Sequence, residues 1–248
     1  EDIRLEFQGP LGGGGVGGHK RASGARREDH DPPLLEMAAS AAADVGLRHT
    51  IHADCRHQPR LGPEALEGIL QSQAVDDGGE HAHVREKAGI FDQSSFAKYE
   101  ISGPGAAEAL EWICAGSVAK QPGRITYTQL LNSRGGIEAD LTVARLSDEH
   151  FYIVTGTGFR THDLAWIRDH LPAHSQARLA DVTEQWGTLS LMGPLARAIL
   201  EAVTTDDVSN AGFPFGHVRV ISIAGVAVRA LRITYVGELG WELHVPLA

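Results

Sequence analysis

The sequence predicts an α+β fold for residues 80–248. Short segments in which apolar and polar residues alternate, joined by glycine-containing turns, indicate antiparallel strand pairs. Between them, stretches with apolar residues at helical spacing indicate helices that pack on the sheets. The chain has 248 residues, of which 42% are hydrophobic and 22% charged, as is typical of a globular protein. This length suffices for one large domain or two small ones.

The predicted elements follow one another closely along the chain. Helices are expected at residues 81–88, 105–115, 159–170 and 195–203. Strands are expected at residues 96–101, 125–131, 139–145, 150–155, 177–182, 187–191, 218–223, 226–233 and 241–245. The strands 218–223 and 226–233 form a hairpin about Ala224-Gly225, because glycine tolerates the positive φ of a tight turn.

Residues 1–79 lack convincing periodicity, and we expect an irregular, largely disordered leader there. Weak helical patterns cover residues 34–47 and 63–71. Gly12, Gly14 and Gly17 satisfy the G-x-G-x-x-G pattern of dinucleotide sites. The strand and helix that must flank such a turn are missing, so we expect no FAD site within this chain.

A cluster of nitrogen and sulfur ligands occupies the same leader. It consists of His49, His52, Cys55 and His57. Zinc sites use separated ligand pairs, whereas these residues crowd one short stretch, so chance spacing among 13 histidines is favoured and no metal is expected.

Charge and composition exclude several classes of protein. The formal net charge of −10 argues against nonspecific nucleic-acid binding. No apolar run reaches the roughly 20 residues of a membrane span. Cys55 and Cys114 do not make a disulfide framework, and Cys114 is expected to be a small buried residue. The first residues resemble neither a signal nor a transit peptide, so we expect a cytoplasmic location, or the mitochondrial matrix if the source is eukaryotic.

The segment 125–143 contains the first candidate site residue. A strand meets a turn at Asn132–Gly136, and the chain returns with Ile137, Ala139, Leu141 and Val143 on one face. Asp140 then falls on the opposite face. Aspartate is poorly favoured within a strand, so Asp140 is either a solvated outer-face residue or a functional one.

A second candidate lies between two glycines in Tyr235-Val236-Gly237-Glu238-Leu239-Gly240-Trp241-Glu242. The apolar strand before it and the alternating strand after it place Glu238 at a strand–turn–strand corner. A carboxylate fixed at such a corner can accept two parallel N–H bonds, which the pyrimidine edge of a pterin offers. The alternative is an ordinary hairpin turn with a solvated glutamate.

These segments together resemble the folate-binding aminomethyltransferase family, that of the glycine-cleavage T-protein. The similarity is strongest to the C-terminal folate domains of dimethylglycine and sarcosine dehydrogenases. It covers about residues 80–246, in the family's order and spacing. The matching segments are Ala88–Tyr99, Ser102–Ala106, Tyr127–Val143, Tyr152–Gly158, Leu189–Pro194 and Arg232–Pro246.

The resemblance implies one-carbon transfer to tetrahydrofolate, yielding 5,10-methylenetetrahydrofolate. Asp140 matches the family's catalytic aspartate, which stabilises the positive charge on the attacking nitrogen and takes part in proton transfer. Glu238, beside Gly237, matches the pterin-holding glutamate. Tyr127 and Val154 match positions that cradle the pterin ring, although as bare residues they suit strand packing.

Tyr235 and Arg232 belong to the same motif as Glu238. Arg232 can pair with Glu238 or with the glutamate tail of folate, or it is a solvated arginine on a strand. The resemblance also implies a carbon donor, which arrives from a flavoprotein half that oxidises an N-methyl amine or on a lipoyl carrier protein.

The implied fold is a cloverleaf of small domains, of which this chain holds most of the first two leaves. The family's C-terminal barrel is missing after residue 248, so the predicted domain 80–248 is incomplete. Two functional alternatives therefore stand beside the transferase, namely a non-catalytic folate-binding or scaffold module and an inactive fragment.

Overall fold

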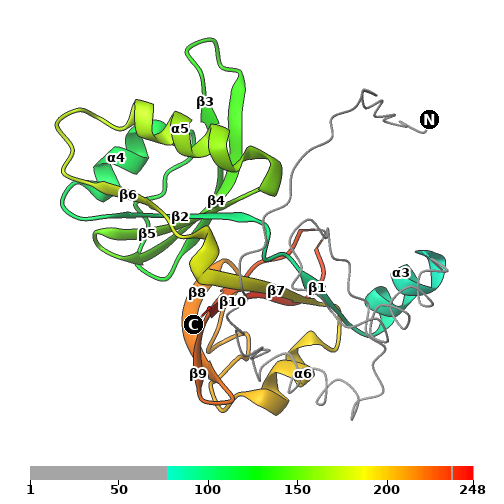
Figure 1. Ribbon diagram of the computed structural model, residues 1–248. Coiled ribbons are helices and arrows are strands. Elements are labelled where there is room, and N and C mark those ends of the chain that lie inside the picture. Colours follow the sequence, from blue (N-terminus) through cyan, green and yellow to red (C-terminus); the bar gives the residue numbers. More distant parts are fainter. Residues whose placement is uncertain (1–76, 236, 248) are drawn as a thin grey trace, which may run out of the picture. The chain divides into compact units, whose positions relative to one another are not determined.

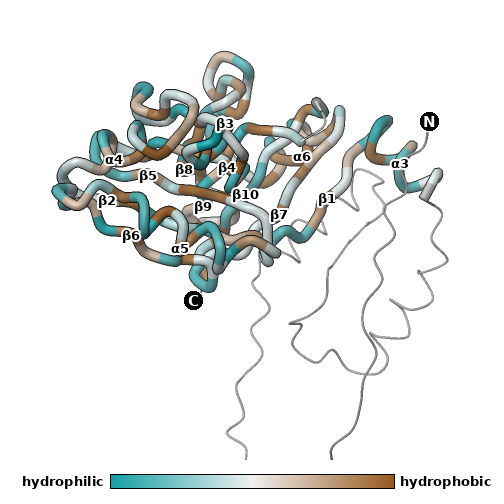
Figure 2. The backbone as a smooth tube through the Cα atoms, turned by 90° about the horizontal axis from the view of Figure 1, so that it is seen from above, coloured by the Kyte–Doolittle hydropathy of each residue, from teal (hydrophilic) through white to brown (hydrophobic). Residues whose placement is uncertain are grey.

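The computed structural model of the protein describes residues 77–235 and 237–247 (Figure 1). The leader features singled out above, including Gly12–Gly17 and the His49–His57 cluster, lie outside the described residues. The first described element is helix α3 (Asp77–Glu86), which begins earlier than the predicted helix 81–88. Figure 2 shows that α3 is largely hydrophilic, whereas the hydrophobic stretches fall mostly within the strands.

One five-stranded antiparallel sheet has the strand order β3-β4-β5-β2-β6. Its strands are β2 (Ala97–Ser102), β3 (Ile125–Leu131), β4 (Ile137–Ser147), β5 (His150–Thr155) and β6 (Arg178–Asp181). Helices α4 (Ala106–Ile113) and α5 (Arg160–His170) lie beside this sheet (Figure 1). Their apolar stripes, including Leu110 and Ile167, pack with Ala139, Leu141 and Val143 into one buried cluster.

The other five-stranded antiparallel sheet has the order β1-β7-β10-β9-β8. Its strands are β1 (Gly89–Asp92), β7 (Trp186–Met192), β8 (His217–Ile223), β9 (Val226–Arg232) and β10 (Gly240–Pro246). Helix α6 (Ala196–Val203) packs Ile199 and Leu200 against it, around the fully buried Trp241. Short 3-10 helices, η1 (Thr157–Phe159) and η2 (Thr183–Gln185), complete the described elements.

The α+β class and the antiparallel sheets with packed helices are therefore confirmed. The two-residue turn of the β8–β9 hairpin is confirmed as well, since Ile223 pairs with Val226 across Ala224 and Gly225. Both turn residues have positive φ, 52° at Ala224 and 83° at Gly225, as tight hairpins with the sheet's twist require.

Some expectations were wrong in detail. Strand β1 was not predicted, and Ile137 is 68% exposed although it is in phase with the buried residues of β4. Ile137 lies at the hairpin end, where the register with β3 shifts between Leu130 and Leu131. Cys114 is a free thiol of intermediate exposure, and burial raises the pKa of its thiol to about 12.

Polar and aromatic groups join the two sheets. The guanidinium of Arg229 on β9 lies 4.2 Å from the ring centroid of Tyr152 on β5 and 4.3 Å from that of Trp186 on β7. Arg229 also donates to Glu100 on β2 over 3.1 Å. An arginine stacked between two rings gains both cation–π attraction and apolar contact, so it fixes the sheets' facing surfaces against each other. No helix in the described part of the chain is long and apolar enough to cross a membrane.

Candidate functional site

A row of directly opposed residues crosses the β3-β4-β5-β2 part of one sheet. Tyr127 pairs with Thr142, Thr142 with Val154, and Val154 with Lys98. Opposed residues of antiparallel strands point to the same face, so this row lies opposite the face that α4 and α5 cover. Asp140, two residues before Thr142, shares that face, which agrees with the prediction from the sequence.

The Asp140 carboxylate is anchored by a neighbouring phenol. The hydroxyl of Tyr127 donates a 2.6 Å hydrogen bond to Asp140 Oδ2, and the Tyr127 ring is 65% exposed. This bond raises the pKa of the Tyr127 phenol, and the nearby Tyr235 adds to the effect. The tyrosine therefore keeps its proton and fixes one carboxylate oxygen, while the other oxygen has no hydrogen-bond partner within the described residues.

The same face is apolar further along the row. Val154 is buried in a cluster with Ile125, Val218 and Leu231, of which the last two belong to the other sheet. Asp140 and Tyr127 thus stand at the solvent-exposed margin of a hydrophobic contact between the sheets. A flat ring placed beside them would meet the exposed ring of Tyr127 and the carboxylate of Asp140.

Glu238 lies in the segment that connects β9 to β10, as the glycine spacing predicted. Gly237 has φ of 95°, a left-handed conformation that favours glycine, and its N–H donates to Thr234 Oγ1 over 3.1 Å. The Glu238 side chain is only 12% exposed, and its Oε1 lies 3.3 Å from Arg85 Nη1 of α3. Arg85 itself is 60% exposed, so the ion pair is weak and leaves Glu238 free to accept from a ligand.

Gly240 is needed for a different reason. A Cβ at this position would lie 2.6 Å from the Leu191 carbonyl oxygen, so strands β10 and β7 approach too closely for any side chain. The two glycines on either side of Glu238 therefore act by different means, one through its dihedral angle and one through its size. Tyr235, in the same connecting segment, is 97% exposed.

Arg232 departs from what the sequence suggested. It is neither solvated nor paired with Glu238, because its side chain is buried and donates to the Phe213 carbonyl and to Asn210 Oδ1. Its guanidinium lies 5.4 Å from the ring centroid of Trp241. Burial, helped by the charge of Arg197, lowers the pKa of Arg232. In this structure Arg232 links β9 to the loop before β8.

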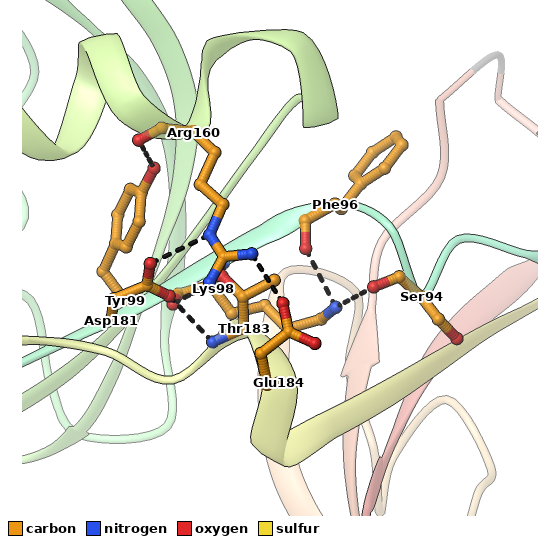
Figure 3. Close-up of polar contacts among 8 residues, drawn as sticks. All are labelled: Ser94, Phe96, Lys98, Tyr99, Arg160, Asp181, Thr183 and Glu184. Carbon is orange, nitrogen blue, oxygen red and sulfur yellow. Dashed lines mark hydrogen bonds and ion pairs between the residues drawn. The ribbon is translucent and has the colours of Figure 1, made fainter. Parts of the chain in front are cut away.

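Sequence reasoning missed Lys98, which is fully buried on the site's face of the sheet. Its Nζ donates to the carbonyl oxygens of Ser94, over 2.8 Å, and Phe96, over 2.9 Å (Figure 3). Burial lowers the pKa of Lys98 to about 8, although Asp92 and other carboxylates oppose the shift. Only its alternation with the core residues Ala97 and Tyr99 placed Lys98 on this face, and nothing local indicated that the face would be covered.

A second polar cluster beside Lys98 holds the η2 turn. Arg160 donates to Asp181 over 2.9 Å and to Glu184 over 2.6 Å, and Tyr99 donates to the Arg160 carbonyl over 2.6 Å (Figure 3). These bonds tie the start of α5 to β2 and β6. Within the described ranges, no group of His, Cys, Asp and Glu side chains is arranged to hold a metal ion.

Comparison with known proteins assigns the chain to a class. The GCVT N-terminal domain family matches residues 71–248, and the chain belongs to this family. The crystal structure of the glycine cleavage system aminomethyltransferase T from Bartonella henselae superimposes with a TM-score of 0.57 at 29% identity, covering 68% of this chain and 44% of that one. The resemblance to T-proteins inferred from the sequence is confirmed.

The similar curated proteins include two kinds of mitochondrial dehydrogenase. The human mitochondrial sarcosine dehydrogenase is 40% identical over 178 residues, which cover 66% of this chain and 19% of that protein. The mitochondrial dimethylglycine dehydrogenase of Rattus norvegicus is 34% identical over 168 residues, covering 67% and 20%. The chain therefore spans about a fifth of the length of these relatives.

Proposed function

We propose that residues 80–248 form a folate-binding domain that transfers a one-carbon unit to tetrahydrofolate, giving 5,10-methylenetetrahydrofolate. The observation that carries the proposal is the exposed carboxylate of Asp140, oriented by Tyr127 at the edge of an apolar face. Membership of the aminomethyltransferase family supports it.

The residues present suit a reduced pterin. The rings of Tyr127 and Tyr235 are largely exposed and close enough to interact, so they offer aromatic surface to a flat bicyclic ligand. Val154 lies on the same face as Tyr127 but is buried against the other sheet, so it offers little surface of its own. Glu238, positioned by Gly237, can accept hydrogen bonds from the ring N–H and the exocyclic amine of the pterin.

The chemistry follows from the placement of Asp140. Bound tetrahydrofolate supplies the nucleophilic nitrogen. The exposed Asp140 carboxylate would stabilise the positive charge that develops on this nitrogen, because a bound ligand displaces water from it and strengthens the attraction. Its Oδ1 is available to take a proton, while Tyr127 occupies Oδ2 and holds the carboxyl plane.

The names of the relatives support a proposal for the carbon donor and the partner. Because the similar dehydrogenases act on sarcosine and dimethylglycine by name, we favour an iminium produced by a flavoprotein half from an N-methyl amine. A lipoyl carrier protein is the alternative. The names of these relatives give them as mitochondrial, which supports the mitochondrial matrix as the proposed location of this chain.

Calorimetric titration with 5-formyltetrahydrofolate, a stable reduced folate, tests the binding half of the proposal. Glu238→Gln keeps the size of the side chain but replaces one acceptor oxygen by a donor, so we expect it to weaken binding at least about tenfold. Glu201→Gln, an exposed carboxylate on α6, is the matched control and should bind as the wild type does. Equal affinity in all three proteins would reject Glu238 as a pterin ligand.

The catalytic half is tested by Asp140→Asn, with formaldehyde or an N-methyl amine plus its dehydrogenase as carbon source. We expect folate affinity within about threefold of the wild type and a transfer rate at least about 100-fold lower, the loss typical of a misplaced or missing charge stabiliser. An Asp140→Asn protein with full transfer activity would remove the catalytic role.

One observation favours a non-catalytic folate-binding module as the second candidate. The chain is 31% identical over 166 residues to a protein of Mus musculus whose name gives it as a regulatory subunit, that of the mitochondrial pyruvate dehydrogenase phosphatase. Saturable folate binding without product from any donor would establish this candidate instead.

A further inference from the structure

The helix α5 carries a buried carboxylate close to the strand that bears Asp140. Asp163, in the first turn of α5, is 1% exposed. A buried carboxylate is costly unless hydrogen bonds satisfy it, and Asp163 uses both of its oxygens. Oδ2 accepts from the hydroxyl of Thr155 over 2.7 Å, and Oδ1 lies 2.9 Å from Nδ1 of His162.

The Thr155 contact reaches β4 from the inner face. Thr155, itself 4% exposed, pairs directly with Leu141, the residue after Asp140. Its Oγ1 also lies 3.4 Å from the Asp140 main-chain carbonyl oxygen. With one proton to donate, the hydroxyl gives it to the nearer carboxylate, and this bond fixes the Thr155 side chain beneath the peptide between Asp140 and Leu141.

The His162 contact reaches β4 from the hairpin side. Nε2 of His162 lies 3.6 Å from Glu138 Oε2, and Glu138 Oε1 accepts from Asn132 Nδ2 over 2.7 Å. Asn132 in turn accepts the N–H groups of Arg134 and Gly136 in the β3–β4 turn. Asp163 is thus connected to β4 at Glu138, two residues before Asp140, and at Leu141, one residue after it.

We infer that Asp163 is a positioning residue for Asp140, acting through Thr155 and His162 to hold the strand on both sides of the carboxylate. The effect on catalysis rests on the proposed function, whereas the effect on the position of the Asp140 carboxylate does not. The carboxylate of Asp140 meets Tyr127 at 2.6 Å only while β4 keeps its place relative to β3. The Asp163 network supplies that constraint from α5, which packs against the face of β4 opposite Asp140.

Thr155→Val is the sharpest test, because valine has the same shape and removes only the hydroxyl. The first readout is an alkaline absorbance titration of the Tyr127 phenol, isolated by subtracting the same titration of Tyr127→Phe. We expect the pKa of Tyr127, raised in the wild type by its bond to Asp140, to fall toward 10 in Thr155→Val. The second readout is transfer kinetics, with kcat at least about tenfold lower and the folate KM within about twofold.

Thr155→Ser keeps the hydroxyl and should restore both readouts. His162→Gln loosens the arm through Glu138 and should shift the Tyr127 titration in the same direction, which keeps the inference testable if Thr155→Val does not fold. A folded Thr155→Val protein with the wild-type Tyr127 titration overturns the inference even if the chain is an active transferase. A shifted titration in a chain that shows no transfer upholds the inference and rejects the proposed function.

Discussion

Replacement of Lys98 by methionine should remove a pH-dependent penalty on folding. The amine is fully buried, and burial lowers its pKa from 10.5 to about 8. Between these values the unfolded chain binds the proton and the folded protein does not, so the free energy of unfolding rises with pH. Below about pH 8 the whole penalty is present, and the shift corresponds to about 3 kcal/mol.

The measurable part of this penalty lies between pH 7 and pH 9.5. With a pKa of 10.5 in the unfolded chain and about 8 in the folded protein, the penalty should fall by about 2 kcal/mol over that interval in the wild type. It should not change in Lys98→Met, which has no amine. The variant also leaves the carbonyl oxygens of Ser94 and Phe96 without their donor, at a cost of about 1–3 kcal/mol. Because that cost does not vary with pH, the change in the difference between the two proteins isolates the charge.

Urea unfolding of both proteins at pH 7 and pH 9.5 gives the four free energies needed. We expect the wild type to gain about 2 kcal/mol on Lys98→Met as the pH rises, whatever the sign of the difference at pH 7. Lys120→Met, which removes an exposed lysine, should show no such change. A difference between wild type and Lys98→Met that stays constant over this interval would refute the lowered pKa of Lys98.

Three further outcomes follow from the same structure. Gly240→Ala should lower the free energy of unfolding by about 1–3 kcal/mol in urea, because the new Cβ would lie 2.6 Å from the Leu191 carbonyl oxygen; unchanged stability would contradict this close approach. Arg232→Lys keeps the charge but loses the pair of hydrogen bonds that the guanidinium donates, one of them to Asn210, so the free energy of unfolding should fall by about 1–3 kcal/mol in the same assay. Unchanged stability would mean that these hydrogen bonds are dispensable. Burial alone would raise the pKa of the Glu111 carboxyl, but two backbone N–H donors outweigh it and lower the pKa below 4.5. The wild type should therefore be more stable than Glu111→Gln at neutral pH, and this advantage should shrink as the pH falls below about 4.5; an advantage that persists in acid would disprove the lowered pKa.

The sequence predicted those elements whose signals are local. Strands β3 and β5 have the predicted bounds, 125–131 and 150–155, because alternation and the adjacent turns are both written within a few residues. Strand β1 was missed for the opposite reason. Its four residues form a strand only by pairing with β7, where Gly89 opposes Met192, and no pattern within so short a segment indicates a partner about 100 residues away.

The candidate site shows the same division. Alternation placed Asp140 on the outer face of β4, and two glycines placed Glu238 at a corner, so the position of both carboxylates was predictable. Arg232, Lys98 and Asp163 were not, because a charged residue is buried only when elements from elsewhere in the chain cover its face. Arg232 looked like a ligand in the sequence, and the loop before β8 turns it into a structural donor.

The candidate site combines exposed side chains that the sequence predicted with buried charged side chains that it did not. Asp140 and Tyr127 are exposed and hold each other by one bond, an arrangement that tolerates little movement between β3 and β4. The buried charges lie behind or beside that face, Asp163 under β4 and Lys98 under the loop that precedes β2. A buried charge that is held by hydrogen bonds resists displacement, because a shift would break those bonds. Of these buried charges, Asp163 is the one whose contacts reach β4 on both sides of Asp140. The Thr155 variants therefore test positioning of Asp140, whereas Lys98→Met tests the energetic cost of burying a charge.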